Sequence, residues 1–167
     1  MHMTDTRAES SLSSINDDEI PMDKPLYISF DPGPHTGWAV LTQDRTFFLG
    51  GESISPDLVP HSFAGLLQRM STYYRMESIV IIESFTLTNR PKDTKQATIT
   101  LQQIGALKYV ATRFGITPIM QIANTRKLAD TKTLKSAGLW CPRLTHAQSA
   151  SRHLGSYLIT KGILKPV

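Results

Sequence analysis

Hydrophobic and polar residues follow two different periods along the chain, and these periods predict its elements. Short apolar, β-branched and aromatic runs predict strands at residues 26–30, 38–41, 46–50, 78–82 and 116–122. Apolar residues at helical spacing predict helices at about 60–75, 97–114, 124–137 and 145–160. Asn124 and Thr145 are expected to cap the last two helices.

The connections between these elements predict how the strands pair. Only tight turns separate the first three strands, which favours an antiparallel meander. The run Ser78–Ile82 is continuous and β-branched, which is typical of a central parallel strand buried on both faces. We therefore expect an α/β fold with a mixed five-stranded sheet, three antiparallel strands and then two parallel ones, flanked by helices.

The first 24 residues differ from the rest of the chain. They are polar, rich in Ser and Asp and without period, so we expect residues 1–24 to be a disordered tail and 25–167 to form one domain. The tail lacks the apolar segment of a secretory signal, and no apolar run reaches the roughly 18 residues of a membrane span. A single cysteine, Cys141, fits a reducing compartment. These features predict a cytoplasmic protein without a membrane partner.

The charge distribution changes this picture by suggesting a partner. The formal net charge is +4, from 18 Lys and Arg against 14 Asp and Glu. Residues 1–23 hold six of the acids and one of the bases, so the remainder carries 17 bases, 8 acids and a net charge of +9. A body this basic favours a polyanion such as nucleic acid, because Lys and Arg release condensed counterions on binding. A basic surface without a particular purpose is the alternative.

Two acids are placed where chemistry could use them. Asp31 directly follows the first strand and Glu83 directly follows the fourth. If those strands are neighbours, the two carboxylates lie at the same edge of the sheet, where they repel unless a cation lies between them. Oxygen ligands suit Mg²⁺ or Mn²⁺, and two such ions are the usual device for hydrolysing a phosphodiester. Turn initiation by Asp31 and a solvated strand end at Glu83 are the alternatives.

Three segments together resemble one family. DPGPHTG after the first strand, IIES at the fourth and HAQSASRH on the last helix are similar to the RuvC-like Holliday-junction resolvases, particularly the small phage-type ones. The segment IGALKYVATRFGITPIMQ adds to the likeness, which covers roughly residues 26–162. The resemblance implies an RNase H-like fold and a homodimer that cuts four-way DNA junctions by metal-dependent hydrolysis, in recombination and repair.

The resemblance also implies a catalytic set. Asp31 and Glu83 match the first two catalytic carboxylates, and the pattern of the last helix falls on His146 and Ser149. Their i, i+3 spacing puts both on one helical face, so His146 can serve as a metal ligand or in proton transfer. Ser149 departs from the family because it stands where an acid is typical. We therefore expect weak, Mn²⁺-preferring or absent activity, with Mg²⁺ or Mn²⁺ held by Asp31, Glu83 and His146.

Other readings of the two helix histidines stay open. His146 can cap and pack its helix beside Thr145, and His153 can be a packed, hydrogen-bonded residue or a DNA contact.

Candidate DNA contacts are expected outside this set. Phe85 could stack on an unpaired base, with core packing as the alternative. The candidates for phosphate contacts are basic residues, with a solvated surface as the alternative: Arg90, Lys92, Lys95, Arg126, Lys127, Lys132, Lys135 and Arg152. The helix at 97–114 is the expected dimer surface, because Gly105 and Ala106 permit close approach, with ordinary packing against the sheet as the alternative.

Three functions follow from these patterns. The first is a junction-directed, metal-dependent endonuclease. The second is a junction-binding module of the same fold that does not cut DNA, an option that Ser149 keeps open. The third is an ATPase with an actin-like phosphate loop, but such enzymes need two domains and a far longer chain than 167 residues.

Overall fold

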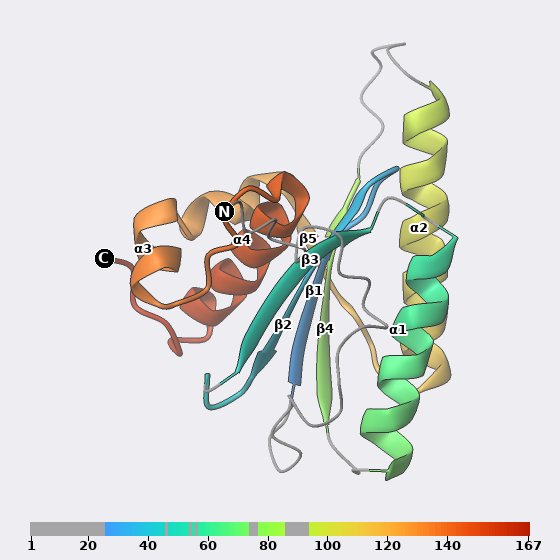
Figure 1. The fold of residues 1–167 in the computed structure, drawn as a ribbon, viewed down its shortest axis with the longest axis horizontal. Coiled ribbons are helices and arrows are strands. Elements are labelled where there is room, and N and C mark those ends of the chain that lie inside the picture. Colours follow the sequence, from blue (N-terminus) through green and yellow to red (C-terminus); the bar gives the residue numbers. More distant parts are fainter. Residues whose placement is uncertain (1–25, 46, 54, 56, 74–76, 86–93) are drawn as a thin grey trace, which may run out of the picture.

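A single sheet with helices on both faces forms the centre of the molecule (Figure 1). The computed structural model describes residues 26–45, 47–53, 55, 57–73, 77–85 and 94–167, with the side chains of residues 72, 73 and 94 excepted. The tail expected at residues 1–24 lies outside the described residues.

The sheet has five strands in the order β3-β2-β1-β4-β5. Their bounds are β1 Leu26–Asp31, β2 Thr36–Thr42, β3 Phe48–Ser53, β4 Ser78–Ser84 and β5 Ile119–Ile122. The pairs β1–β2 and β2–β3 are antiparallel, whereas β1–β4 and β4–β5 are parallel. The mixed sheet expected from the sequence is therefore confirmed.

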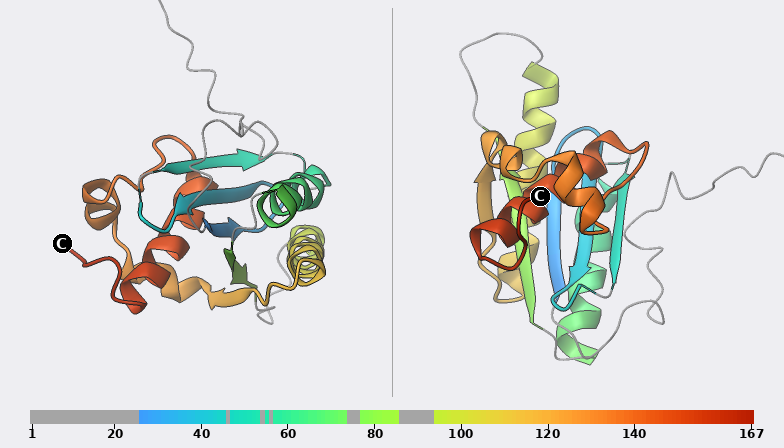
Figure 2. Two further views of the ribbon diagram at one scale, coloured as in Figure 1. Left: turned by 90° about the horizontal axis from the view of Figure 1, so that it is seen from below. Right: turned by 90° about the vertical axis from the view of Figure 1, so that its left-hand side faces the viewer.

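Helices lie on both faces of the sheet (Figures 1 and 2). The helices α1 (Leu58–Gln68) and α2 (Thr94–Arg113) lie on one face, and α1 continues as a π-helical turn over Arg69–Tyr73. The helices α3 (Thr131–Ser136) and α4 (Thr145–Thr160) lie on the other. Both faces of the central strands are thus buried, which explains their continuous apolar runs.

Each face has its own apolar core. Alternate residues of β1 point to opposite faces, so Phe30 packs with α1 and α2, and Tyr27 packs with α4. On the first face Phe30 and Phe63 meet edge to face, with ring centroids 4.8 Å apart. On the second, Leu154 of α4 is fully buried with Leu41 of β2. Asp31 lies four residues after Tyr27 in the same strand, so its side chain also points toward α4.

The segment after β5 differs from the prediction. A single helix at 124–137 was expected, but the chain forms a 3₁₀ helix, Ala123–Leu128, and then the separate helix α3. Ala129 is extended between them, and the Asp130 carboxylate accepts a hydrogen bond from the Thr133 amide at 2.7 Å. Asp130 is thus a helix cap in the middle of the predicted helix, and the prediction of Asn124 as the cap is wrong.

The start of α4 also differs from the prediction. Thr145 is the first residue of the helix, the position before it is Leu144, and neither provides a side-chain cap. The cap comes instead from a distant strand, as described below.

Among the described residues, no helix is both long and apolar enough to cross a membrane.

Candidate functional site

One row of residues crosses the whole sheet on the face that α4 covers. In the ladders, Glu52 pairs with Gly37, Gly37 pairs with Asp31, and on the other side Glu83 pairs with Gln121. Asp31 and Glu83 directly follow Phe30 and Ile82, which are themselves partners. Because side chains of paired residues point to the same face, four polar groups line up beneath α4. We call Glu52, Gly37, Asp31, Glu83 and Gln121 the polar row.

The turn between β1 and β2 fixes one end of the site. Thr36 is buried, and its hydroxyl donates to the Gly33 carbonyl at 3.0 Å and accepts from the Gly33 amide at 3.4 Å. These bonds close the loop DPGPHT on itself. The loop holds Asp31 at its start and presents the exposed His35, whose ring centroid lies 6.0 Å from that of His146.

The carboxylate of Asp31 contacts the first histidine of α4. Nδ1 of His146 lies 3.0 Å from Oδ2 of Asp31, and the two side chains are 42% and 14% exposed. The hydrogen bond to Asp31 raises the pKa of His146. Because Nδ1 contacts Asp31, Nε2 is the one nitrogen of the His146 ring that lies outside this contact.

The carboxylate of Glu83 contacts the second histidine. Nε2 of His153 lies 2.9 Å from Oε2 of Glu83, and Nδ1 of the same ring lies 2.8 Å from Oε1 of Gln121. His153 is completely buried. The alternative of a packed, hydrogen-bonded histidine therefore describes its environment, although one of its partners belongs to the candidate site.

The two carboxyl groups also affect each other. Burial raises the pKa of Asp31, and the hydrogen bond with Glu83 raises it further. The hydrogen bond with His146 lowers this pKa but does not outweigh the other two effects. Burial would also raise the pKa of Glu83, but the hydrogen bonds with His153 and Asp31 and the charge of Arg126 outweigh it, so this pKa is lowered. The pKa values of the two carboxyl groups are thus shifted in opposite directions.

The donor set suits a hard divalent cation only in part. Two adjacent carboxylates and a partly exposed imidazole are suitable ligands for Mg²⁺ or Mn²⁺. However, no group of three or more His, Cys, Asp or Glu side chains is arranged to hold a metal ion within the described part of the chain. In this arrangement each carboxylate is paired with a histidine. Mg²⁺ sites often use only one or two carboxylates and complete their coordination with water and substrate phosphate, and the site fits that open type.

Glu52 is a site residue that sequence reasoning missed. Its Oε1 accepts hydrogen bonds from the backbone amides of His146 at 2.5 Å and Ala147 at 3.4 Å. A carboxylate here satisfies the free amides at the start of α4 and faces the positive end of the helix dipole. Glu52 lies 94 residues before His146, so no local pattern reveals this cap.

Gly37 makes this approach possible. A Cβ atom at Gly37 would lie 2.1 Å from the carbonyl carbon and oxygen of His146, which is far inside van der Waals contact. The first turn of α4 therefore rests directly on the backbone of β2. Gly37 ends the segment DPGPHTG of the sequence, but this close approach is a property of the tertiary structure.

Ser149 lies on α4 between the two histidines. It is half-buried, three residues after His146 and four before His153, so the three residues share the side of the helix that runs along the site. The carboxylate pair thus receives two histidines from α4 and no acid.

The DNA-contact candidates are placed in different surroundings. Phe85 is 41% exposed just beyond β4, and Lys95, Lys127, Lys132 and Lys135 are exposed. Arg126 is half-buried and close enough to Glu83 to lower its pKa. Arg90 and Lys92 lie outside the described residues.

Arg152 has structural partners within its own domain. It donates to the Thr131 hydroxyl at 2.9 Å, and its guanidinium carbon lies 5.8 Å from the centre of the Trp140 ring. These contacts tie α4 to α3 and the loop after it, so a contact with DNA stays a prediction.

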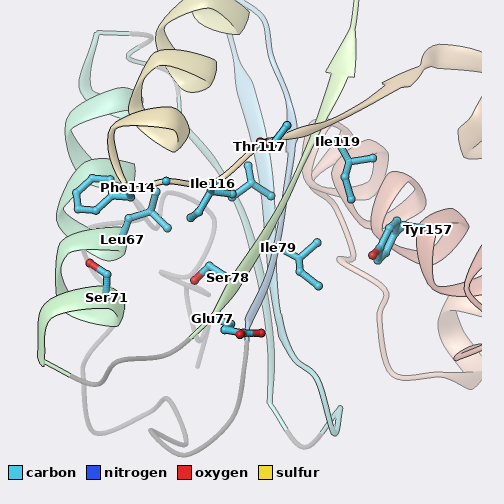
Figure 3. Close-up of a pocket in the computed structure, with 12 residues that line it drawn as sticks. Leu67, Ser71, Glu77, Ser78, Ile79, Phe114, Ile116, Thr117, Ile119 and Tyr157 are labelled. Atoms are coloured by element: carbon cyan, nitrogen blue, oxygen red, sulfur yellow. The ribbon is translucent and has the colours of Figure 1, made fainter.

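A pocket at the other end of the strands lies away from the polar row. Its volume is about 490 Å³, and Figure 3 shows it between Leu67, Phe114 and Ile116 on one side and Glu77 and Ser78 at the start of β4. No residue of the polar row lines it. The candidate site is instead a surface at the ends of β1 and β4.

The fold is similar to that of known RuvC structures. A structure of T. thermophilus RuvC in complex with Holliday junction substrate matches with a TM-score of 0.59 and 18% identity, covering 86% of this chain and 99% of that one. A second T. thermophilus RuvC structure matches with a TM-score of 0.56 and 16% identity, covering 85% and 99%. No protein-family model and no curated protein sequence matches the chain. These similarities establish a RuvC-like fold.

Proposed function

We propose that this chain is a metal-dependent, structure-selective endonuclease that hydrolyses phosphodiester bonds in four-way or branched DNA. The observation that carries the proposal is the adjacent pair Asp31 and Glu83, with His146 on Asp31, at the strand ends of a RuvC-like fold. One of the similar structures is a RuvC in complex with Holliday junction substrate. Together they support DNA junctions as the substrate class.

The ions expected are Mg²⁺ or Mn²⁺, two per site, held by Asp31, Glu83 and His146. When bound, such ions supply polarisation of the scissile phosphate and a water of lowered pKa. Because Ser149 contributes no charge, a second ion would depend on water and phosphate oxygens for most of its ligands. A nitrogen ligand from His146 favours Mn²⁺ over Mg²⁺.

The protein residues have separate tasks in this proposal. The carboxylates of Asp31 and Glu83 attract cations to the strand ends and orient them. Because Asp31 holds the ring of His146 through Nδ1, Nε2 has one of two tasks: it either ligates an ion or, when it does not, accepts a proton from the attacking water or returns one to the leaving oxygen. Glu52 keeps the start of α4, and with it His146, against the sheet.

The DNA is expected to extend from this edge over nearby basic and aromatic residues. Phe85 would stack on an unpaired base, and Arg126, Lys127 and Lys132 would contact phosphates. Arg90, Lys92, Lys95 and Arg152 complete the proposed contact set.

A homodimer would place two such sites on one junction. We propose α2 as its interface because Leu101 and Tyr109 on this helix are 40% and 65% exposed, and a Cβ at Gly105 would meet nothing within 4 Å.

A cleavage assay on a synthetic four-way junction with Mg²⁺ or Mn²⁺ tests the proposal. We expect slow, Mn²⁺-preferring cleavage that Asp31→Asn abolishes and Ser149→Asp increases. Absence of cleavage by both the unsubstituted chain and Ser149→Asp would reject the enzyme. Binding to the same junction in EDTA, compared with linear duplex DNA, tests substrate recognition separately.

A non-cutting junction-binding module is the second candidate. Ser149 and the pairing of both carboxylates with histidines favour it. Tight junction binding in EDTA with no metal-dependent cutting would support this function instead.

A further inference from the structure

The completely buried His153 is not used by the proposed chemistry, yet it touches the candidate site. Both of its ring nitrogens have partners, Glu83 of β4 at 2.9 Å and Gln121 of β5 at 2.8 Å. Buried polar groups are costly unless they are hydrogen-bonded, so the ring depends on both partners. The three side chains form one chain that joins two strands to α4.

The amide oxygen of Gln121 decides which atom donates in its hydrogen bond with His153. Its Oε1 can only accept a hydrogen bond, so Nδ1 of His153 carries a hydrogen and donates to it. The other nitrogen, Nε2, faces Oε2 of Glu83, and because an ionised carboxylate also only accepts, Nε2 donates to it and both ring nitrogens carry a hydrogen in this arrangement. Gln121 is 8% exposed and is the ladder partner of Glu83, so the amide and the carboxylate lie side by side beneath the same ring.

The packing of α4 fixes the ring from behind. Two residues after His153, a Cβ at Gly155 would lie 2.7 Å from Cδ2 of Leu134 and 2.8 Å from Cβ of Ala129. Leu154 is fully buried in the core of this face. This part of the helix is thus seated closely against its neighbours, and the ring has little freedom to turn away from Glu83.

We propose that His153, oriented by Gln121, is a positioning residue that holds the Glu83 carboxylate in place for a divalent cation. The use of the carboxylate rests on the proposed function, but the chain of hydrogen bonds does not. Groups that orient a metal ligand commonly contribute about 10–100-fold to metal affinity or activity. Because Ser149 supplies no acid, the orientation of the two remaining carboxylates matters more in this protein.

Gln121→Met tests the inference without removing His153 or Glu83. Methionine has a similar shape but cannot accept the hydrogen bond from Nδ1. Gln148→Met is the matched control, since Gln148 is a half-buried glutamine whose Nε2 donates to the Cys141 carbonyl at 2.9 Å, away from Glu83. Thermal unfolding of both variants measures the purely structural cost of losing one glutamine hydrogen bond.

Two readouts on the full chain decide the outcome. In the metal-free protein, nitrogen NMR of labelled histidine should show Nδ1 of His153 protonated, and Gln121→Met should shift the Glu83 carboxyl carbon signal while Gln148→Met does not. In a calorimetric Mn²⁺ titration, Gln121→Met should weaken binding by about 10–100-fold relative to Gln148→Met.

The possible failures are distinguishable. If the unsubstituted protein binds no Mn²⁺ and cuts no junction, the proposed function is rejected, and the metal-free NMR then decides whether the hydrogen bonds of His153 hold Glu83. An unprotonated Nδ1, or an unmoved Glu83 signal in Gln121→Met, would overturn the inference. So would equal Mn²⁺ affinities of the two methionine variants in a protein that binds the ion.

Discussion

The two histidines of α4 occupy equivalent positions in the chemistry of the site but opposite positions in its packing. His146 contacts Asp31 and is 42% exposed, whereas His153 contacts Glu83 and is fully buried. They are seven residues apart, close to two helical turns, so one helix reaches both carboxylates from the same side. An exposed histidine can exchange protons with water and substrate, while a buried one with two partners can only hold its neighbours. The half of the site with His146 and Asp31 can therefore contact substrate, whereas His153 in the other half supports Glu83.

The largest effect should come from displacing the His146 half alone. In Gly37→Ala, a Cβ would lie 2.1 Å from the His146 carbonyl, so the first turn of α4 must move away from β2. We expect about a hundredfold loss of junction cleavage or more, together with a loss of about 1–3 kcal/mol of unfolding free energy. Gly65→Ala in α1 is the control, because nothing lies within 4 Å of a Cβ there. Equal cleavage by the two variants would contradict the close approach.

Replacing His146 should separate activity from stability. His146→Gln is expected to lower single-turnover cleavage of a four-way junction in Mn²⁺ by about 10²–10⁴-fold, because an amide cannot transfer the proton. The free energy of unfolding should change by less than about 1 kcal/mol, since this side chain is partly exposed. Full cleavage by this variant would remove His146 from the proposed chemistry.

Replacing His153 should show the reverse balance. His153→Leu leaves the carboxylate of Glu83 and the amide of Gln121 without their buried partner, which should cost about 2–4 kcal/mol in urea unfolding. A loss as small as that of His146→Leu, measured in parallel, would mean that burial does not distinguish the two histidines.

The cap on α4 should have a smaller effect. Glu52→Ala removes the acceptor for the amides of His146 and Ala147, with an expected cost of about 0.5–2 kcal/mol and a parallel loss of cleavage. Glu77→Ala is the control, because Glu77 is an exposed acid at the opposite end of β4 and should change stability by less than about 0.5 kcal/mol. An unchanged stability of Glu52→Ala would show that α4 does not need this cap.

The carboxyl groups of Asp31 and Glu83 should be protonated one after the other as the pH falls. Since the pKa of Asp31 is raised and that of Glu83 is lowered, a carbon NMR titration of the carboxyl groups should show Asp31 protonated first as the pH falls. Glu83 therefore stabilises the fold above its ordinary pKa of 4.5, and this contribution is lost as the pH falls through the lowered value. Ionised Asp31 has the opposite sign, so its cost is relieved as the pH falls through its raised pKa. The reverse order of protonation would contradict the pairing of Glu83 with His153.

The candidate site was only partly accessible from sequence. The pairing of β1 with β4 was a condition of the sequence argument, and the structure meets it, so that Asp31 and Glu83 lie together. His146 was identified through a resemblance and a helical spacing. Glu52 and Gln121 were missed, because each enters the site through strand register and no local pattern encodes it. The only signal for His153 was its place one turn after Ser149 on the helix that carries His146.

The local prediction failed where a side chain competes with the helix. The segment 124–137 has helical spacing, but the Asp130 carboxylate bonds to the Thr133 amide and starts a new helix. Propensity alone does not decide such a case, because the cap satisfies backbone amides that a continuous helix would satisfy equally well.

The sequence by itself therefore determined the strands, their mixed antiparallel and parallel pairing and the two carboxylates at strand ends. Hydrophobic burial sets these features, and it depends on residue type and period. Only the tertiary structure decided that α4 crosses the polar row, that Glu52 caps it and that Gly37 lets it approach. These contacts join residues far apart in the chain. They form only when the register of the five strands and the position of α4 on the sheet bring those residues together.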